Sequence, residues 1–244
     1  MIALTQGIVL KRIKYGDSSQ IVHVFTRQFG LQSCMIKGLG RNRESNRRGN
    51  LLTPASIVEL SIYYREEQNI KLIKEVHAGY FYHSLSEDII KNSVAVFALE
   101  VLQNLLLADD VQEELFAFSR RFLIHLDESE TGALANYPLY FLVHAGSLCG
   151  YRIFGSYRSD TPYLNLREGR FSSDEHLQMS EVYPESIPYM SRLNEARDYE
   201  SIQAIKMSHD VRMIVLKQFL AFFQYHLPRF RPLKSVAVFG GIFS

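Results

Sequence analysis

Apolar residues recur with a period of about two through the first 78 residues of the chain. Five runs rich in Val, Ile, Tyr and Phe are separated by Gly or polar residues, a pattern typical of short β-strands. The runs cover residues 7–14, 20–27, 31–37, 56–64 and 70–77. In the fourth run apolar residues fill both registers, as expected for a strand buried on two sides in a small barrel. The pattern predicts a five-stranded OB-fold β-barrel, with an SH3-like barrel as the alternative.

After residue 77 the period changes to about 3.6, which indicates helices. Ser86 is a candidate N-cap for a first helix, with Glu87 and Asp88 in its first turn. Asp109 and Asp110 are expected to open a second helix. The apolar stripe of the first comprises Ile90, Val94, Phe97, Ala98, Val101, Leu102, Leu105 and Leu106, and that of the second Leu115, Phe116, Phe118, Phe122, Leu123 and Leu126.

Two further helices are expected in the rest of the chain. Pro138 begins one that ends at Gly150, in keeping with the preference for Pro in a first turn and Gly after a last one. Residues 151–188 are irregular in pattern and suggest at most a small hairpin. A final amphipathic helix covers about residues 202–226, and Pro228 ends it.

The charge also differs between the two parts of the chain. The whole chain carries a net charge of +1, but residues 1–80 hold 12 Lys and Arg against 6 Asp and Glu, while residues 81–244 hold 15 against 20. A basic first third and an acidic remainder indicate one surface for a polyanion and another for a different partner. We therefore predict an α+β chain with a polyanion-binding barrel at residues 1–80 and a helical domain at residues 81–244, which carries a central insert at about residues 151–190.

A basic loop at residues 38–49, GLGRNRESNRRG, contains four arginines and one glutamate. An isolated run of this kind is most simply a solvated loop, but the neighbouring strands carry further cations. Tyr15 and Phe29 occupy turns where exposed rings could stack on unpaired bases. The candidate phosphate contacts are Lys11, Arg12, Lys14, Arg27, Lys37, Arg41, Arg43, Arg47 and Arg48. Such cations bind DNA by releasing its condensed counterions, without reading the bases.

Catalysis and metal binding have little support in the sequence. Cys34 and Cys149 are the only cysteines and fall in different predicted domains, which excludes a disulfide framework and fits a reducing compartment. The eight histidines show no HExxH or HxH spacing, and the GLG of residues 38–40 completes neither a Walker loop nor a dinucleotide fingerprint. The paired acids within residues 109–114 are better explained as helix-start residues than as metal ligands. We predict no enzymatic activity, no cofactor and no bound metal.

The start of the chain lacks a charged region followed by a long apolar stretch, so no signal peptide is evident. No apolar run approaches the roughly 20 residues that span a bilayer. These features predict a cytoplasmic protein without membrane contact, which DNA binding would associate with the nucleoid.

Short motifs follow one another through the first part of the chain. They are Tyr15-Gly16-Asp17, Phe25-Thr26-Arg27 with Gly30, Lys37-Gly38 with Arg41, and Leu52 with Pro54. Their order resembles that of the bacterial RecO family of recombination mediators, most specifically over residues 7–60. The stretches HAGSLCGY, ending at Tyr151, and YHLPRFRPLKS, at residues 225–235, resemble the helix end before that family's central insert and its closing helix and tail.

This resemblance implies an OB-fold that binds single- and double-stranded DNA and promotes strand annealing. It further implies that the protein works with RecR to load recombinase onto strands coated by single-strand-binding protein. The helical domain would hold a pocket for the acidic, apolar C-terminal tail of that coating protein, and by analogy its candidates are Phe118, Arg121 and Phe141. Many family members carry a four-cysteine zinc site in the insert, but residues 152–176 of this chain contain no cysteine.

Two other interpretations stay open from the residues alone. An RNA-binding OB-fold module would use the same cations, since phosphate contacts do not distinguish nucleic acids. A metal-dependent hydrolase or nuclease would use the acidic patches. Annealing of complementary DNA oligomers without nucleotide or metal, and the absence of cleavage with Mg²⁺ or Mn²⁺, would separate these interpretations from the first.

Overall fold

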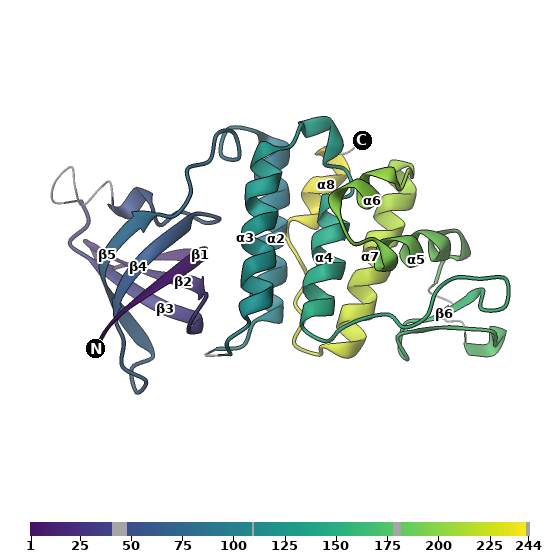
Figure 1. Cartoon of the computed structure of the whole chain (residues 1–244), viewed down its shortest axis with the longest axis horizontal. Helices are drawn as coiled ribbons and strands as arrows, with labels where there is room; N and C mark the ends of the chain where they lie inside the picture. Colours follow the sequence, from purple (N-terminus) through teal and green to yellow (C-terminus); the bar gives the residue numbers. More distant parts are fainter. Residues whose placement is uncertain (41–47, 109, 178–181, 243–244) are drawn as a thin grey trace. The chain divides into compact units, whose positions relative to one another are not determined.

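The chain forms two compact units, Met1–Glu128 and Ser129–Ser244 (Figure 1). The computed structural model describes residues 1–40, 48–108, 110–177 and 182–242. The first unit contains the barrel and two long helices, and the second contains the remaining helices and a small hairpin. The division predicted at residue 80 falls inside the first unit, between the barrel and its helices.

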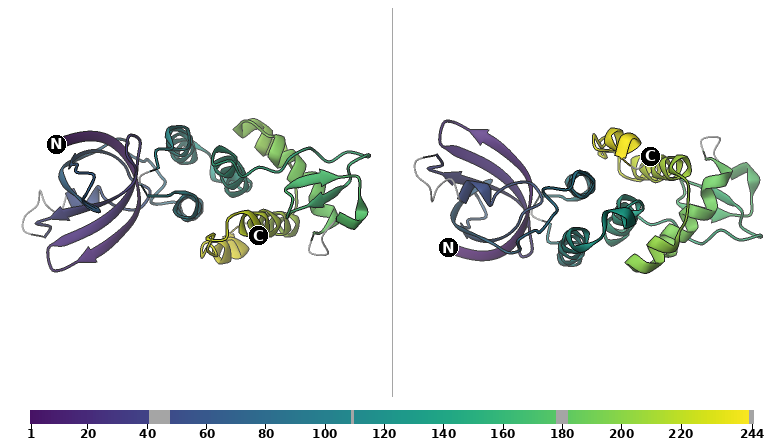
Figure 2. Two further views of the ribbon diagram at one scale, coloured as in Figure 1. Left: turned by 90° about the horizontal axis from the view of Figure 1, so that it is seen from below. Right: turned by 90° about the horizontal axis from the view of Figure 1, so that it is seen from above.

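Five strands close the barrel of the first unit. They are β1 Ile2–Tyr15, β2 Ser19–Thr26, β3 Gly30–Lys37, β4 Ile57–Tyr63 and β5 Ile70–Ala78. The order around the barrel is β1-β2-β3-β5-β4, with β3 parallel to β5 and every other pair antiparallel. Two further views of the barrel are given in Figure 2. The predicted OB-fold is confirmed, and the closure leaves no long unpaired edge strand among these five.

Alternate side chains of the strands fill the barrel, together with Leu52 from the segment between β3 and β4. The buried set includes Val9, Val22, Val24, Cys34, Ile36, Val58, Leu60, Ile62, Ile73 and Val76. The segment that follows the basic loop is tied back to β1, because the Ala55 N–H donates to the Val9 carbonyl at 2.8 Å and the Val9 N–H donates to the Ser56 carbonyl at 3.0 Å. The barrel core therefore fixes where the basic loop rejoins the fold.

Two helices complete the first unit, α2 Ile89–Leu105 and α3 Glu113–Glu128. The predicted cap at Ser86 is wrong by two residues, because the Asp88 carboxylate accepts the N–H groups of Ile90 and Lys91 and so starts α2 there. Helix α3 begins at Glu113, after the predicted Asp110, and residue 109 lies outside the described residues. The predicted core face of α3 is buried throughout, as is that of α2 except for the half-buried Ile90.

Helix α3 packs against one end of the barrel. The rings of Phe25 and Phe116 meet edge to face with centroids 5.4 Å apart. Gly30 begins β3 with a φ of 63°, and a Cβ at this position would collide with the Asp110 carbonyl. A glycine is therefore required where the segment before α3 crosses the barrel.

The second unit is mainly helical. Its elements are α4 Tyr137–Leu148, β6 Tyr163–Asn165, β7 Arg170–Ser172, α5 Ile187–Glu195, α6 Tyr199–Ala204, α7 His209–His226 and α8 Val236–Ile242, with single 3₁₀ turns at Thr131–Ala133, Glu175–Leu177 and Pro184–Ser186. The predicted helix from Pro138 to Gly150 and the predicted hairpin are both confirmed. None of the described helices is long and apolar enough to cross a membrane.

The prediction of one continuous helix at about residues 202–226 is wrong. The segment is divided into α6 and α7, because Ser208 caps a new start by accepting the Val211 N–H at 3.3 Å. Helices α4 and α7 then approach so closely that a Cβ on Gly146 would collide with the Phe223 ring. Helix α5 was not predicted, since its nine residues fall at the edge of the irregular insert.

Candidate nucleic-acid interface

The hairpin of β1 and β2 presents the predicted cations of the first strand. A β-bulge between Val9 and Lys11 shifts the register, and beyond it every residue from Lys11 to Tyr15 is exposed. Successive side chains of a strand point to opposite faces. Lys11 and Tyr15 therefore lie on one face of the hairpin, and Arg12 and Lys14 lie on the other.

The first of these faces is the outside of the barrel, and we call Lys11 and Lys37 the outer cations. Lys11 stands opposite His23 on β2, and Tyr15 stands opposite Ser19, which in turn stands opposite Lys37 on β3. Burial and the nearby charge of Lys11 lower the pKa of His23 below its ordinary value, so its ring is neutral at pH 7. The positive charge of this face therefore comes from its lysines.

The second face continues the inward-pointing side of β2 and carries Arg12 and Lys14. We call these two residues, together with Arg48 at the end of the basic loop, the mouth cations. Arg12 Nη1 donates to the Gly49 carbonyl at 3.2 Å, which holds the end of the basic loop against β1. Arg48 Nη2 donates to the Lys74 carbonyl of β5 at 3.2 Å. Three cations from two separate segments thus gather at one end of the barrel.

The basic loop is anchored to this hairpin at both ends. The Leu39 N–H donates to the Ser18 carbonyl in the β1–β2 turn at 2.9 Å, and the Gly49 carbonyl accepts from Arg12. The three predicted contacts within the loop, Arg41, Arg43 and Arg47, lie outside the described residues. Because both anchors are on the hairpin, the two described ends of the loop lie beside the β1–β2 hairpin.

Arg27 is not brought together with the other candidates. It follows Thr26 at the end of β2, whereas Lys14 and Lys37 flank the first residues of that strand. Eight strand residues span roughly 26 Å. The Arg27 guanidinium instead bonds the Glu113 carboxylate, with Nε and Nη2 at 2.9 and 2.5 Å from Oε1. Both side chains are about half exposed, so the pair contributes at most about 1 kcal/mol.

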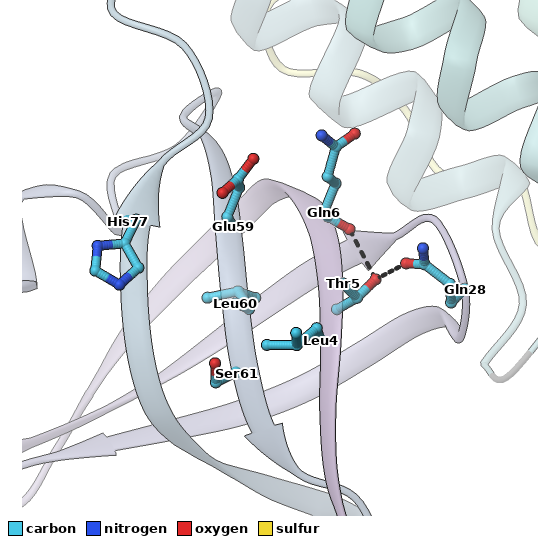
Figure 3. Close-up of a pocket in the computed structure, with 8 residues that line it drawn as sticks. All are labelled: Leu4, Thr5, Gln6, Gln28, Glu59, Leu60, Ser61 and His77. Carbon is cyan, nitrogen blue, oxygen red and sulfur yellow. Dashed lines mark hydrogen bonds between the residues drawn. The ribbon is translucent and has the colours of Figure 1, made fainter.

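A pocket of about 270 Å³ on the barrel has a different character (Figure 3). It is lined by Leu4, Thr5, Gln6, Gln28, Glu59, Leu60, Ser61 and His77. The Thr5 hydroxyl lies within hydrogen-bond distance of both the Gln28 side-chain carbonyl and the Gln6 backbone carbonyl, which fixes one wall. Glu59 is the one carboxylate among the lining residues, and its negative charge disfavours phosphate. This pocket does not extend the basic surface.

The insert at residues 151–190 contains no cysteine. The hairpin β6–β7 is held by buried Leu164, Leu166 and Phe171, and no three His, Cys, Asp or Glu side chains gather as metal ligands in the described part of the chain. Burial raises the pKa of Cys34 to about 12, so its thiol stays protonated. Cys149 caps α4 in the other unit. Apolar packing therefore holds the described part of the insert.

The three candidates for a partner's tail differ in accessibility. Arg121 is exposed on α3, and Phe118, one turn before it, is only 8% exposed. Phe141 is completely buried in α4, in the second unit, and offers no surface. Residues 81–128 hold 3 Lys and Arg against 9 Asp and Glu, so Arg121 is one of few cations in an acidic pair of helices.

The sequence contains a signal for part of this arrangement. Period-two alternation along the first strand is enough to place Lys11 on one face of the strand and Arg12 and Lys14 on the other. Lys74, whose carbonyl holds Arg48, was not singled out, and its side chain is exposed beside Glu75 with an Nζ–Oε1 distance of 3.4 Å. No local signal in residues 70–77 indicates that contact, because it joins segments 26 residues apart.

Two family models match this chain. The model described as "Recombination protein O N terminal" matches residues 1–80, and the one described as "Recombination protein O C terminal" matches residues 86–237. Together they cover the barrel and most of the helical remainder.

Curated relatives match over almost their whole length. A protein from Phocaeicola vulgatus, named DNA repair protein RecO, is 31% identical over 248 residues, which is 100% of both chains. Proteins of the same name from Flavobacterium psychrophilum and Christiangramia forsetii are 27% and 26% identical, covering 98% and 100% of both chains respectively.

Proposed function

This chain belongs to the RecO family of DNA repair proteins, and from that premise we propose that the β1–β2 hairpin and the basic loop bind the phosphate backbone of single- and double-stranded DNA and promote annealing. The observation that carries the proposal is the placement of cations on both faces of one hairpin. Lys11 lies on one face, beside Lys37 of the neighbouring strand β3, and Arg12 and Lys14 lie on the other, where Arg12 also holds Gly49 at the end of the loop.

The family assignment decides between the alternatives left open by the residues. Members of the family are DNA repair proteins without enzymatic activity, which confirms the prediction that this chain is not an enzyme and removes the nuclease interpretation. DNA rather than RNA is the expected polyanion for such a protein.

Annealing follows physically from backbone contacts on two faces. Two complementary strands repel each other through their phosphates, and cations that neutralise phosphates reduce this repulsion. Phosphate contacts leave the base edges free to pair, because they carry no sequence information. We suggest that one strand contacts the mouth cations and the loop while the second is approached by the outer cations, so that both are neutralised beside one hairpin.

The proposed partners act at other surfaces. RecR and single-strand-binding protein enter this proposal through the family resemblance, with the chain assisting RecR in loading recombinase onto coated strands. Exposed Arg121 on α3, beside the edge of Phe118, is the part of the predicted tail site that has accessible surface. Its contact with an acidic tail would be a charge-assisted pair.

An annealing assay tests the proposal. Complementary DNA oligomers carrying a fluorophore and a quencher are mixed with the full chain in the presence of chelator and without nucleotide. We expect faster pairing than the spontaneous reaction, a loss of this acceleration in Lys14→Gln/Arg48→Gln, and intact oligomers after incubation with Mg²⁺ or Mn²⁺. Pairing at the spontaneous rate would contradict annealing, and acceleration limited to RNA oligomers would favour the RNA-binding interpretation.

A further inference from the structure

A polar cleft of about 490 Å³ lies in the second unit, between the segment before α4 and the start of α7. Its lining residues are Glu130, Gly132, Ala133, Ala135, Asn136, Gln203, Ile205, Lys206, Met207 and Arg212. The segment before α4 contributes mainly Gly and Ala, and a Cβ on Gly132 would meet no atom within 4 Å. These small side chains leave the cleft open.

One cation in the cleft is held in a fixed position. Arg212 Nε donates to Asn136 Oδ1 at 3.0 Å, and Nη2 donates to the Met207 carbonyl at 3.1 Å. Asn136 is itself held, because its Nδ2 donates to the carbonyls of Ile202 and Ile205 at 3.0 and 2.8 Å. A guanidinium has five N–H donors, and these two bonds leave others for a ligand. Because its side chain is already ordered, binding a ligand costs little further entropy.

The electrostatics of the cleft favour an anion. Burial lowers the pKa of Arg212 from its ordinary value but leaves it charged at neutral pH. Arg212 lies near the N-terminus of α7, where the helix dipole disfavours a cation and favours an anion. Lys206 adds a second positive charge in the loop before that helix. Glu130 is the one carboxylate among the lining residues, and it is exposed and forms no salt bridge with either cation.

The geometry points to a phosphate group of a nucleic-acid backbone as the ligand of this cleft, and we propose it as a second DNA contact, separate from the barrel; this inference rests on the proposed function. A guanidinium fork and an ammonium group are the usual pair for phosphate oxygens. No aromatic ring is among the residues that line the cleft, so it offers no stacking platform for a base. Residues 129–244 hold 12 Lys and Arg against 11 Asp and Glu, so the attraction is local to the cleft.

Matched variants of the full chain test the site without disturbing Arg212. Gly132→Asp places a carboxylate in the open space of the cleft, and Gly132→Asn is its neutral counterpart of nearly equal size. Lys206→Gln removes a cation at the cleft, and the control Lys217→Gln removes an exposed cation on α7 that does not line the cleft. Binding to a labelled oligothymidine is measured by fluorescence anisotropy at several salt concentrations, with thermal melting to confirm folding.

We expect Gly132→Asp and Lys206→Gln to weaken binding several-fold. Each should also make the negative slope of log K against log salt shallower by about 0.7. Gly132→Asn and Lys217→Gln should bind as the wild type does. Equal affinity for Gly132→Asp and Gly132→Asn would overturn the inference. A second result would also overturn the inference: inorganic phosphate raises the melting temperature of the wild type but not of Gly132→Asp, while both bind the oligonucleotide equally. The cleft would then bind free phosphate and not DNA.

The barrel variant Lys14→Gln/Arg48→Gln separates this inference from the proposed function. If it weakens binding while the cleft variants do not, the cleft assignment is wrong and the barrel assignment survives. If the cleft variants weaken binding and the barrel variant does not, the proposed function of the hairpin is wrong.

Discussion

The Asp127 carboxylate accepts the backbone N–H of Leu85 at 2.8 Å, which joins the end of α3 to the connection between the barrel and α2. The N–H groups of His83 and Ser84 donate to the same carboxylate at 2.9 and 2.8 Å. Lys91 Nζ, on a buried side chain, donates to the Asp127 carbonyl at 2.7 Å. One buried acid thus satisfies three donors of a segment that has no regular secondary structure.

Asp127→Ala should destabilise the first unit by about 2–4 kcal/mol, because it leaves the buried Leu85 N–H and the partly buried N–H groups of His83 and Ser84 without their acceptor. Glu114→Gln removes an exposed acid from the same helix and should cost less than about 1 kcal/mol. Urea unfolding followed by circular dichroism measures both. Similar midpoints for the two variants would show that the Asp127 bonds contribute little.

The same carboxylate makes stability depend on pH. Burial alone would raise the pKa of Asp127, but the three N–H bonds and the Ser84 hydroxyl outweigh burial and hold the pKa below its ordinary value of 3.8. A carboxylate with a lowered pKa contributes stability above its unfolded pKa and loses it as pH falls through the folded one. The difference in unfolding free energy between wild type and Asp127→Asn should therefore be constant from pH 7 to about 5 and shrink below about pH 4. A difference that grows on acidification would contradict this assignment.

The structure of the insert leads to a prediction about metal content. Because apolar side chains hold the β6–β7 hairpin and the cysteine ligands are absent from residues 152–176, the purified protein should contain no stoichiometric zinc. Chelator should leave its melting temperature unchanged. Elemental analysis giving one tightly held zinc per chain would require ligands other than the family's cysteines.

A charge reversal on α3 tests the proposed contact with the tail of single-strand-binding protein. Arg121→Glu should abolish binding of a fluorescent tail peptide, because it adds a repulsive carboxylate to helices that are already acidic. DNA annealing should stay near normal, since Arg121 lies outside the hairpin. A variant of the basic loop with its four arginines changed to Ala should behave oppositely and keep the peptide. Unchanged peptide affinity in Arg121→Glu would move the tail site elsewhere.

Local sequence patterns predicted the elements that form through interactions between residues close together in the chain. The five strands, the buried faces of α2 and α3, and helix α4, which ends at Leu148 just before Gly150, all follow from periodicity and capping. The break between α6 and α7 was missed because the apolar stripe continues past it, and the cap at Ser208 overrides the stripe. The separation of Arg27 from the mouth cations could not be predicted, since its partner Glu113 is 86 residues away. For the same reason the burial of Phe141, which depends on tertiary packing, was not anticipated.

The salt dependence of DNA binding tests the central claim most directly. In the variant with Arg41, Arg43, Arg47 and Arg48 all changed to Ala, affinity should fall similarly for oligomers of different sequence, because phosphate contacts read no bases. The negative slope of log K against log salt should become shallower by about 0.7–0.9 for each phosphate that is no longer neutralised. Arg27→Ala, which removes a cation already paired with Glu113 at the far end of β2, is the matched control and should leave the slope unchanged. An unchanged slope in the folded loop variant, or an equal decrease in Arg27→Ala, would contradict a DNA site at the basic loop and barrel mouth.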